Sequence, residues 1–108
     1  MLAHDAIEEL RKRFKSDAAR DLSATYLIHV KGEGGGAWLT CITEGECQFI
    51  PHEIESGTKF DCAISIDAED LAMIMDGRMT AMTAALSGAL AVDGELALAM
   101  KLVPIFFN

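Results

Sequence analysis

The sequence predicts an α+β domain whose five-stranded, mainly antiparallel sheet is covered on one face by helices. Three observations lead to this expectation. A helical pattern comes first, a run of four short strand patterns follows, and apolar helical segments then surround a fifth short strand. Strands that follow one another directly favour antiparallel pairing, whereas regular strand–helix alternation favours a parallel sheet. The chain has 108 residues and shows no repeat or linker, so we expect residues 1–108 to form a single domain.

The first helix is expected from about Leu2 to Lys15. Four apolar residues recur there at 4-3-4 spacing, which places them on one helix face: Ala3, Ile7, Leu10 and Phe14. Four basic residues between Arg11 and Lys15 lie near its C-terminal end, where positive charge favours the helix dipole.

Four strands are expected next, at residues 24–30, 37–43, 46–53 and 60–66. Apolar residues alternate along them, so one face of each strand should be buried. Glu44 and Gly45 supply a hairpin turn between the second and third strands. Pro51 cannot donate to a strand ladder, so the third strand should lie at an edge or stop pairing there.

The C-terminal part predicts three helices and a fifth strand. We place the helices at residues 67–77, 79–87 and 95–102, and the strand at residues 89–93. Asp67 would cap the first of these helices in a capping-box pattern with Asp70, and Gly77 would end it. Gly88 should close the second helix, and Pro104 should stop the third because it has no N–H to donate.

The net charge of −8 is unevenly distributed. Residues 1–21 hold five bases and five acids, and the remainder holds four bases and twelve acids. Such an acidic body should repel nucleic acid and anionic lipid surfaces. No apolar run resembles a signal peptide or approaches the ~20 residues that span a bilayer. Together with three cysteines that lack close spacing, this favours a cytoplasmic protein with reduced thiols.

Each candidate for chemistry has a simpler structural explanation. The glycines of residues 32–36 precede a strand, whereas a phosphate-binding loop precedes a helix, and Glu33 would repel phosphate. The three histidines and three cysteines show no close metal-ligand spacing. Cys41 or Cys62 with His29 could suggest a thiol nucleophile, but Cys62 falls on the apolar face of its strand and Cys41 on the face opposite Trp38, which favours structural thiols. The paired carboxylates of Glu69 and Asp70 suit a helix start. We therefore expect no enzymatic activity, no metal site and no cofactor.

Five methionines fall in the C-terminal half, at positions 73, 75, 79, 82 and 100. Methionine is unbranched and polarisable, so it suits surfaces that accept ligands of varied shape, although it also fills ordinary cores. The residues alone leave both interpretations open.

The order and spacing of several motifs resemble the sterol carrier protein-2 (SCP2-like) lipid-transfer domain family, from near Gly36 to about Leu102. The motifs that carry the resemblance are Gly36-Ala37-Trp38, Glu44-Gly45, residues 61–66, Glu69-Asp70-Leu71 with Gly77, residues 88–94 and residues 98–102. The resemblance implies an SCP2-like fold with a hydrophobic tunnel between sheet and helices, which holds sterols, fatty acyl chains or similar lipids without a cofactor. Ala89 and Ala91 stand where the family often has Lys, and a peroxisomal C-terminal signal is missing, which favours a bacterial cytoplasmic member.

Apolar periodicity and the family's layout together predict lipid-binding residues at Ile42, Ile64, Leu71, Met75, Met82, Leu86, Met100, Val103 and Phe106. The tail from Pro104 to Phe107 would act as a gate. We expect non-catalytic binding, and transfer, of a lipid or fatty-acyl ligand by a monomer or weak homodimer. The Arg11–Lys15 cluster offers transient membrane contact as an alternative to a solvated face. The alternative function is a protein-interaction or accessory module of a lipid or isoprenoid pathway, whose apolar groove takes a partner or closes a homodimer.

Overall fold

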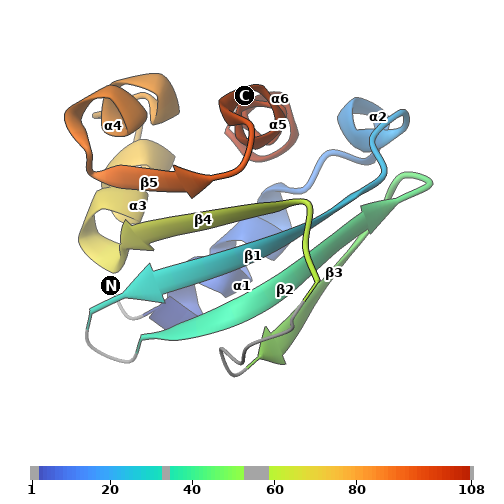
Figure 1. Cartoon of the computed structure of the whole chain (residues 1–108), viewed down its shortest axis with the longest axis horizontal. Coiled ribbons are helices and arrows are strands. Elements are labelled where there is room, and N and C mark those ends of the chain that lie inside the picture. Colours follow the sequence, from blue (N-terminus) through green and yellow to red (C-terminus); the bar gives the residue numbers. More distant parts are fainter. Residues whose placement is uncertain (1–2, 33–34, 53–58, 108) are drawn as a thin grey trace.

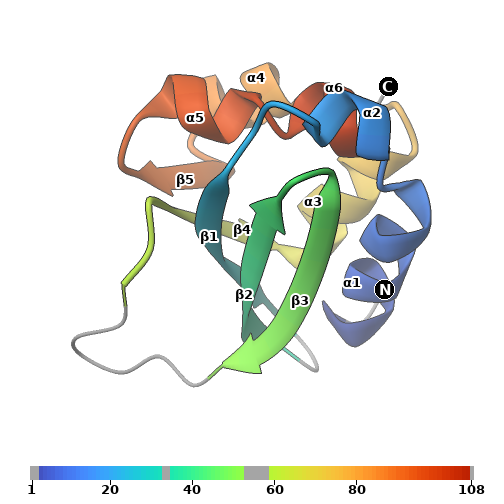
Figure 2. The same ribbon diagram turned by 90° about the vertical axis from the view of Figure 1, so that its right-hand side faces the viewer.

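A computed structural model shows one sheet with the helices gathered over one of its faces (Figure 1; Figure 2). The structure describes residues 3–32, 35–52 and 59–107. Its elements are, in chain order, α1 (Ala3–Arg13), α2 (Ser16–Ala19), β1 (Ala24–Lys31), β2 (Gly36–Thr43), β3 (Glu46–His52), β4 (Cys62–Asp67), α3 (Ala68–Met75), α4 (Ala81–Ser87), β5 (Leu90–Asp93), α5 (Leu96–Met100) and α6 (Val103–Phe106). The predicted α+β class is confirmed.

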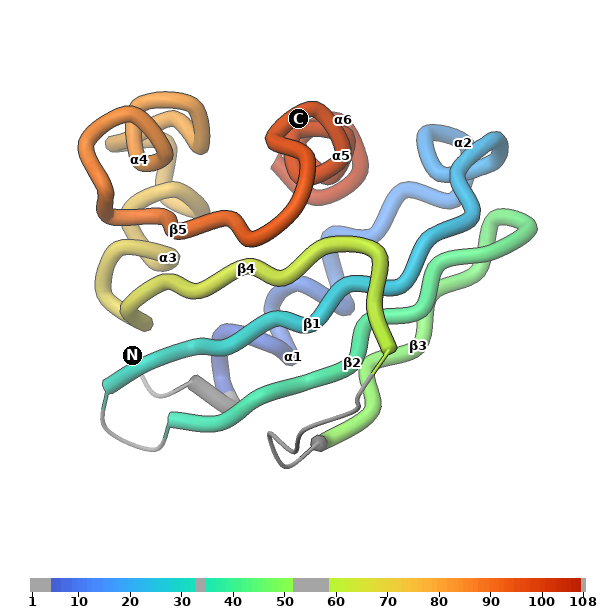
Figure 3. The backbone as a smooth tube through the Cα atoms, in the orientation of Figure 1, coloured from blue at the N-terminus to red at the C-terminus, as the bar shows by residue number. Residues whose placement is uncertain are grey.

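The five strands lie side by side in the order β3-β2-β1-β4-β5, as the tube drawing in Figure 3 shows from one edge of the sheet to the other. Three neighbouring pairs are antiparallel, and β1 with β4 is parallel, so the sheet is mixed and mainly antiparallel. A fourth strand that formed a hairpin with β3 would be antiparallel to it. Here β4 instead crosses to the other side of β1 and runs parallel to it. Within the described residues β3 pairs only with β2, which confirms the edge position that Pro51 predicted.

The strand register brings apolar side chains into rows on the face that the helices cover. Ile28 in β1 lies opposite Trp38 in β2 and Ile64 in β4, and all three are buried. Tyr26 in turn lies opposite Cys62. Side chains alternate across a strand, so these positions follow from the alternating sequence pattern.

Two turns form as the sequence predicts. Glu44 and Gly45 have φ values of 52° and 76°, the two positive values that a tight type I′ hairpin requires. Gly77, with a φ of 79°, ends α3 in a Schellman arrangement. Its N–H donates to the Ile74 carbonyl, and the N–H of Arg78 donates to the Met73 carbonyl.

The capping box at the start of α3 is not formed. Asp67 is the N-cap, but its side chain makes no capping hydrogen bond. Asp67 is also the last residue of β4, opposite Lys31, and its side chain is exposed to solvent. A cap that the sequence analysis missed is at α4, where the Thr80 hydroxyl accepts a 3.0 Å hydrogen bond from the Thr83 N–H.

The C-terminal segment also departs from the prediction. The helix expected over residues 95–102 ends at Met100, and Pro104 lies inside a new short helix, α6. Proline is tolerated in the first turn of a helix because the N–H there has no partner within the helix. The benefit of the new helix is burial, since Ile105 and Phe106 are 1% and 2% exposed.

One further strand boundary differs from expectation. The fourth strand begins at Cys62 and not at Phe60. Asp61, just before the strand, makes two hydrogen bonds to Thr25 in β1. The Thr25 N–H donates to the Asp61 carboxylate at 2.7 Å, and the Asp61 N–H donates to the Thr25 carbonyl. The short helix α2 was not predicted. Glu53, expected to end the third strand, lies outside the described residues.

Tyr26 links the sheet to the C-terminal helices. Its side chain is fully buried, and its hydroxyl donates a 2.7 Å hydrogen bond to the carbonyl of Leu98 in α5. A second link joins the Lys15 N–H to the carbonyl of Ile105 in α6 at 3.0 Å. Phe106 completes the attachment, with ring centroids 5.8 Å from Phe14 and 6.0 Å from Phe49.

We expect Tyr26 to ionise at unusually high pH. Burial, with lesser contributions from Cys62 and Asp61, raises its pKa from 10.0 to about 12. It is the chain's single tyrosine, so the ultraviolet absorbance of tyrosinate reports on this residue alone. The native midpoint should lie near pH 12, and in denaturant near pH 10.

The raised pKa makes stability depend on alkaline pH. The folded state keeps the Tyr26 proton after the unfolded state has lost it, so this contribution is complete below pH 10 and is lost as pH rises towards 12. The free energy of unfolding should fall by about 1.4 kcal/mol per pH unit more in the wild type than in Tyr26→Phe across that window. Equal slopes for the two proteins would contradict this assignment.

Candidate functional site

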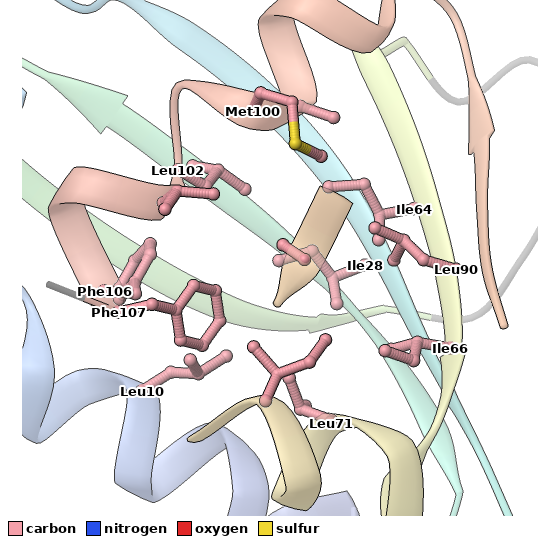
Figure 4. Close-up of a pocket in the computed structure, with 14 residues that line it drawn as sticks. Leu10, Ile28, Ile64, Ile66, Leu71, Leu90, Met100, Leu102, Phe106 and Phe107 are labelled. Atoms are coloured by element: carbon pink, nitrogen blue, oxygen red, sulfur yellow. The ribbon is translucent and has the colours of Figure 1, made fainter. Parts of the chain in front are cut away.

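An apolar cavity lies between the inner face of the sheet and the helices (Figure 4). Its volume is about 50 Å³. It is lined by Leu10, Ile28, Ile64, Ile66, Leu71, Ile74, Ala81, Leu90, Ala99, Met100, Leu102, Val103, Phe106 and Phe107. These residues come from the sheet and from helices on several sides, so the tertiary fold assembles the site.

Every side chain in the wall is apolar. Ile28, Ile64 and Ile66 on adjacent β1 and β4 form the sheet side, and Leu71 and Phe106 face them from the helices (Figure 4). Such a wall has no side chain that could donate a hydrogen bond or transfer a proton. What it can do is remove hydrocarbon from water.

The solvent side of the cavity is formed by the C-terminal helices. The sheet residues of the wall are at most 8% exposed, whereas Met100, Val103 and Phe107 are only partly buried. The rim therefore belongs to α5, α6 and the residue that follows α6. This is the segment that the links from Tyr26 and Lys15 hold in place.

Five of the nine residues predicted to contact lipid line this cavity, namely Ile64, Leu71, Met100, Val103 and Phe106. Ile42 and Met75 are buried in the core outside its wall. Met82 and Leu86 also lie outside it, with 43% and 78% of their surface exposed on α4. Lipid contact itself stays a prediction, which we carry forward for the five residues in the wall.

The sequence analysis missed nine wall residues: Leu10, Ile28, Ile66, Ile74, Ala81, Leu90, Ala99, Leu102 and Phe107. Ile28 and Ile66 could have been found, because they alternate with residues already assigned to the buried face. Ala81 carried no signal of its own, since a small residue on a short helix borders a cavity only after the helix has been placed.

Two of the cysteine thiols among the described residues have raised pKa values. Burial, followed by the nearby Cys41, raises the pKa of the Cys47 thiol to about 12, and burial, followed by Asp93 and Asp61, raises that of Cys62. A thiol must ionise to act as a nucleophile, so both are poorly suited to that role. The described residues contain no cluster of three or more His, Cys, Asp or Glu that could hold a metal ion.

We expect these two thiols to resist modification. At pH 8, a thiol-specific alkylating reagent should leave Cys47 and Cys62 of the native protein largely intact, because little thiolate is present at either residue and Cys62 is also buried. Peptide mass mapping of native and denatured samples provides the measurement. Rapid labelling of Cys47 or Cys62 in the native state would contradict the assigned pKa shifts.

No helix in the described parts of the chain is long and apolar enough to cross a membrane.

The fold and the cavity define a small α+β domain with an apolar cavity between its sheet and its helices. Residues 5–107 match the SCP-2 sterol transfer family, and the chain belongs to this family. It is 28% identical over 106 residues to sterol carrier protein 2 of Bos taurus, a match that covers 93% of this chain. The chain spans about a fifth of that relative's length, since the match covers 19% of it.

Solved structures confirm the SCP2-like fold. The solution structure of palmitated SCP2L2 from Aedes aegypti matches with a TM-score of 0.75 and 18% identity, and the match covers 100% of this chain and 96% of that one. A double mutant of the sec-alkyl sulfatase PisA1 matches with a TM-score of 0.82 and 15% identity, covering 100% of this chain and 17% of the sulfatase chain. The same fold therefore occurs alone and inside a longer chain.

Proposed function

We propose that this protein binds a ligand with a flexible alkyl chain in its apolar cavity and transfers that ligand between lipid phases. The observation that supports this most strongly is the uniformly apolar wall. Burying each CH₂ group there favours binding by about 0.8 kcal/mol, with little dependence on the rest of the molecule. Membership of the SCP-2 sterol transfer family and the likeness to a palmitated relative point the same way.

The cavity must grow to accept such a ligand. A volume of about 50 Å³ is well below the roughly 300 to 1,000 Å³ of typical small-molecule sites. The sheet side cannot move readily, because the ladders of β1, β2 and β4 fix it. The C-terminal helices are short and form the rim, so we assign the Pro104–Phe107 segment as the gate that moves outward.

The ligand's polar end is expected to remain at the rim. No polar side chain lines the cavity, and an unpaired polar group placed inside would lose its hydrogen bonds to water. A fatty acid would therefore enter with its methyl end first. In this orientation the apolar wall holds the alkyl chain, and binding requires no polar side chain inside the cavity.

The second candidate function is an accessory module of a larger lipid-processing system. The observation that favours it is the sulfatase chain, in which the same fold accounts for only 17% of the length. Analytical ultracentrifugation addresses the version in which the groove closes a homodimer. A carrier remains monomeric at micromolar concentration, whereas a groove-closing homodimer does not.

Filling the cavity should remove lipid binding. Ala81 lines it from the start of α4, so Ala81→Leu adds three carbon atoms to the wall. We expect the affinity for palmitate to fall by about tenfold or more, because the bound chain would have to displace the new side chain. Native mass spectrometry with added palmitate measures the loss.

Ala91→Leu is the matched control, because this residue is exposed on β5 and does not line the apolar cavity. It should bind palmitate like the wild type. Equal binding by the Ala81→Leu variant would show that the ligand lies elsewhere. If the wild type binds neither palmitate nor a sterol, the carrier function itself is excluded.

A further inference from the structure

Helix α4 presents two large apolar side chains to solvent. Met82 and Leu86 lie four residues apart, hence on one side of the helix, and are 43% and 78% exposed. We call these two residues the α4 face. The opposite side of α4 is already satisfied, because Ala81 and Ala84 are buried against the rest of the fold. Packing against the core therefore does not explain why Met82 and Leu86 are apolar.

The charge around this face differs from that of the rest of the chain. Residues 1–76 hold fifteen acids and seven bases, whereas residues 77–108 hold two of each. Between Gly77 and Val92 there is no acidic residue at all, and Arg78 is the one base. In sequence, the α4 face thus lies in a neutral segment of an otherwise acidic protein. A neutral, apolar region can approach an uncharged lipid surface without electrostatic repulsion.

The α4 face also lies beside the site. Ala81, the residue next to Met82, is part of the cavity wall. The rim residues Met100 and Val103 belong to α5 and α6, and α4, α5 and α6 lie along the same side of the molecule in two perpendicular views (Figure 1; Figure 2). A surface that contacts the α4 face would therefore stand close to the cavity rim.

Helix α1 is less suited to such a contact. Its apolar residues Ala6, Ile7 and Leu10 are at most 3% exposed, so they have no surface to insert. Two of its three cations are engaged within the protein: Arg13 pairs with Glu9 at 3.0 Å, and Arg11 donates to the Phe49 carbonyl at 3.2 Å. The expectation of membrane contact through the N-terminal helix finds no support in these contacts.

A second copy of the chain is also a poor occupant. Stable protein interfaces bury about 800 Å² on each partner, around a packed apolar centre. Two exposed side chains on a seven-residue helix offer only a small part of that area. A bilayer surface needs no such area or shape match, since single apolar side chains insert between its headgroups.

From these observations we infer that the α4 face docks on an electrically neutral phospholipid bilayer, so that the ligand passes between bilayer and cavity without crossing water. This inference rests on the proposed carrier function. It adds a surface, a partner and a role for two residues that do not line the cavity.

The test uses phosphatidylcholine vesicles and the full chain, with Leu86→Glu as the variant. Vesicle flotation measures docking, and the rate at which fluorescently labelled palmitate moves from vesicle to protein measures transfer. We expect Leu86→Glu to weaken docking and slow transfer by about tenfold, because a charge replaces an inserted apolar side chain. Palmitate added from solution without vesicles should bind as in the wild type.

Ile50→Glu is the matched control, because Ile50 is 45% exposed, like Met82, but lies on the edge strand β3. It should dock and transfer like the wild type. The inference is overturned if Leu86→Glu behaves like the wild type, if Ile50→Glu loses as much, or if docking requires anionic lipid. If the wild type binds no palmitate even from solution, the carrier function fails, independently of the α4 face.

Discussion

The inner face of the sheet is apolar along its central strands. The placement of the helices, and of the cavity beneath them, depends on how that face is covered. Trp38, Ile28 and Ile64 form one continuous row across three strands. Such a surface cannot remain in water, because each square ångström of exposed hydrocarbon costs about 25 cal/mol. Helices α1 and α3 cover part of it, and the remainder is left to the C-terminal segment.

That segment covers the sheet with two short helices in place of a long one. Met100 ends α5, Val103 starts α6 with Pro104 as its second residue, and the chain bends between the two helices. A bent cover packs less completely than a straight amphipathic helix, and the small apolar cavity lies under it. The attachment is local: Tyr26 and Lys15 supply hydrogen bonds, and Phe106 packs among aromatic rings. A cover held at a few points can move while the sheet stays fixed, which is what the proposed carrier function requires.

The sequence predicted the elements better than their assembly. Alternation in β1, β2 and β4 identified the buried face, and Gly77 and Gly88 marked helix ends, because these signals are local. The parallel pairing of β1 with β4 was not predictable from spacing alone, since it depends on which edge the returning strand meets. At the site, Ile64, Leu71 and Phe106 were found by their apolar positions. Met82 and Leu86 look equally apolar in sequence but face solvent, since burial depends on where α4 packs.

The central claim is that the alkyl chain lies between the inner face of the sheet and the C-terminal helices. The most direct test is solution NMR with ¹³C-labelled palmitate, which detects contacts between the chain and individual side chains. We expect contacts from the palmitate methyl end to Leu71 and to the Phe106 ring, together with shifts along α6. Contacts confined to Leu27 and Ala63, which line a shallow depression outside the cavity, would contradict it.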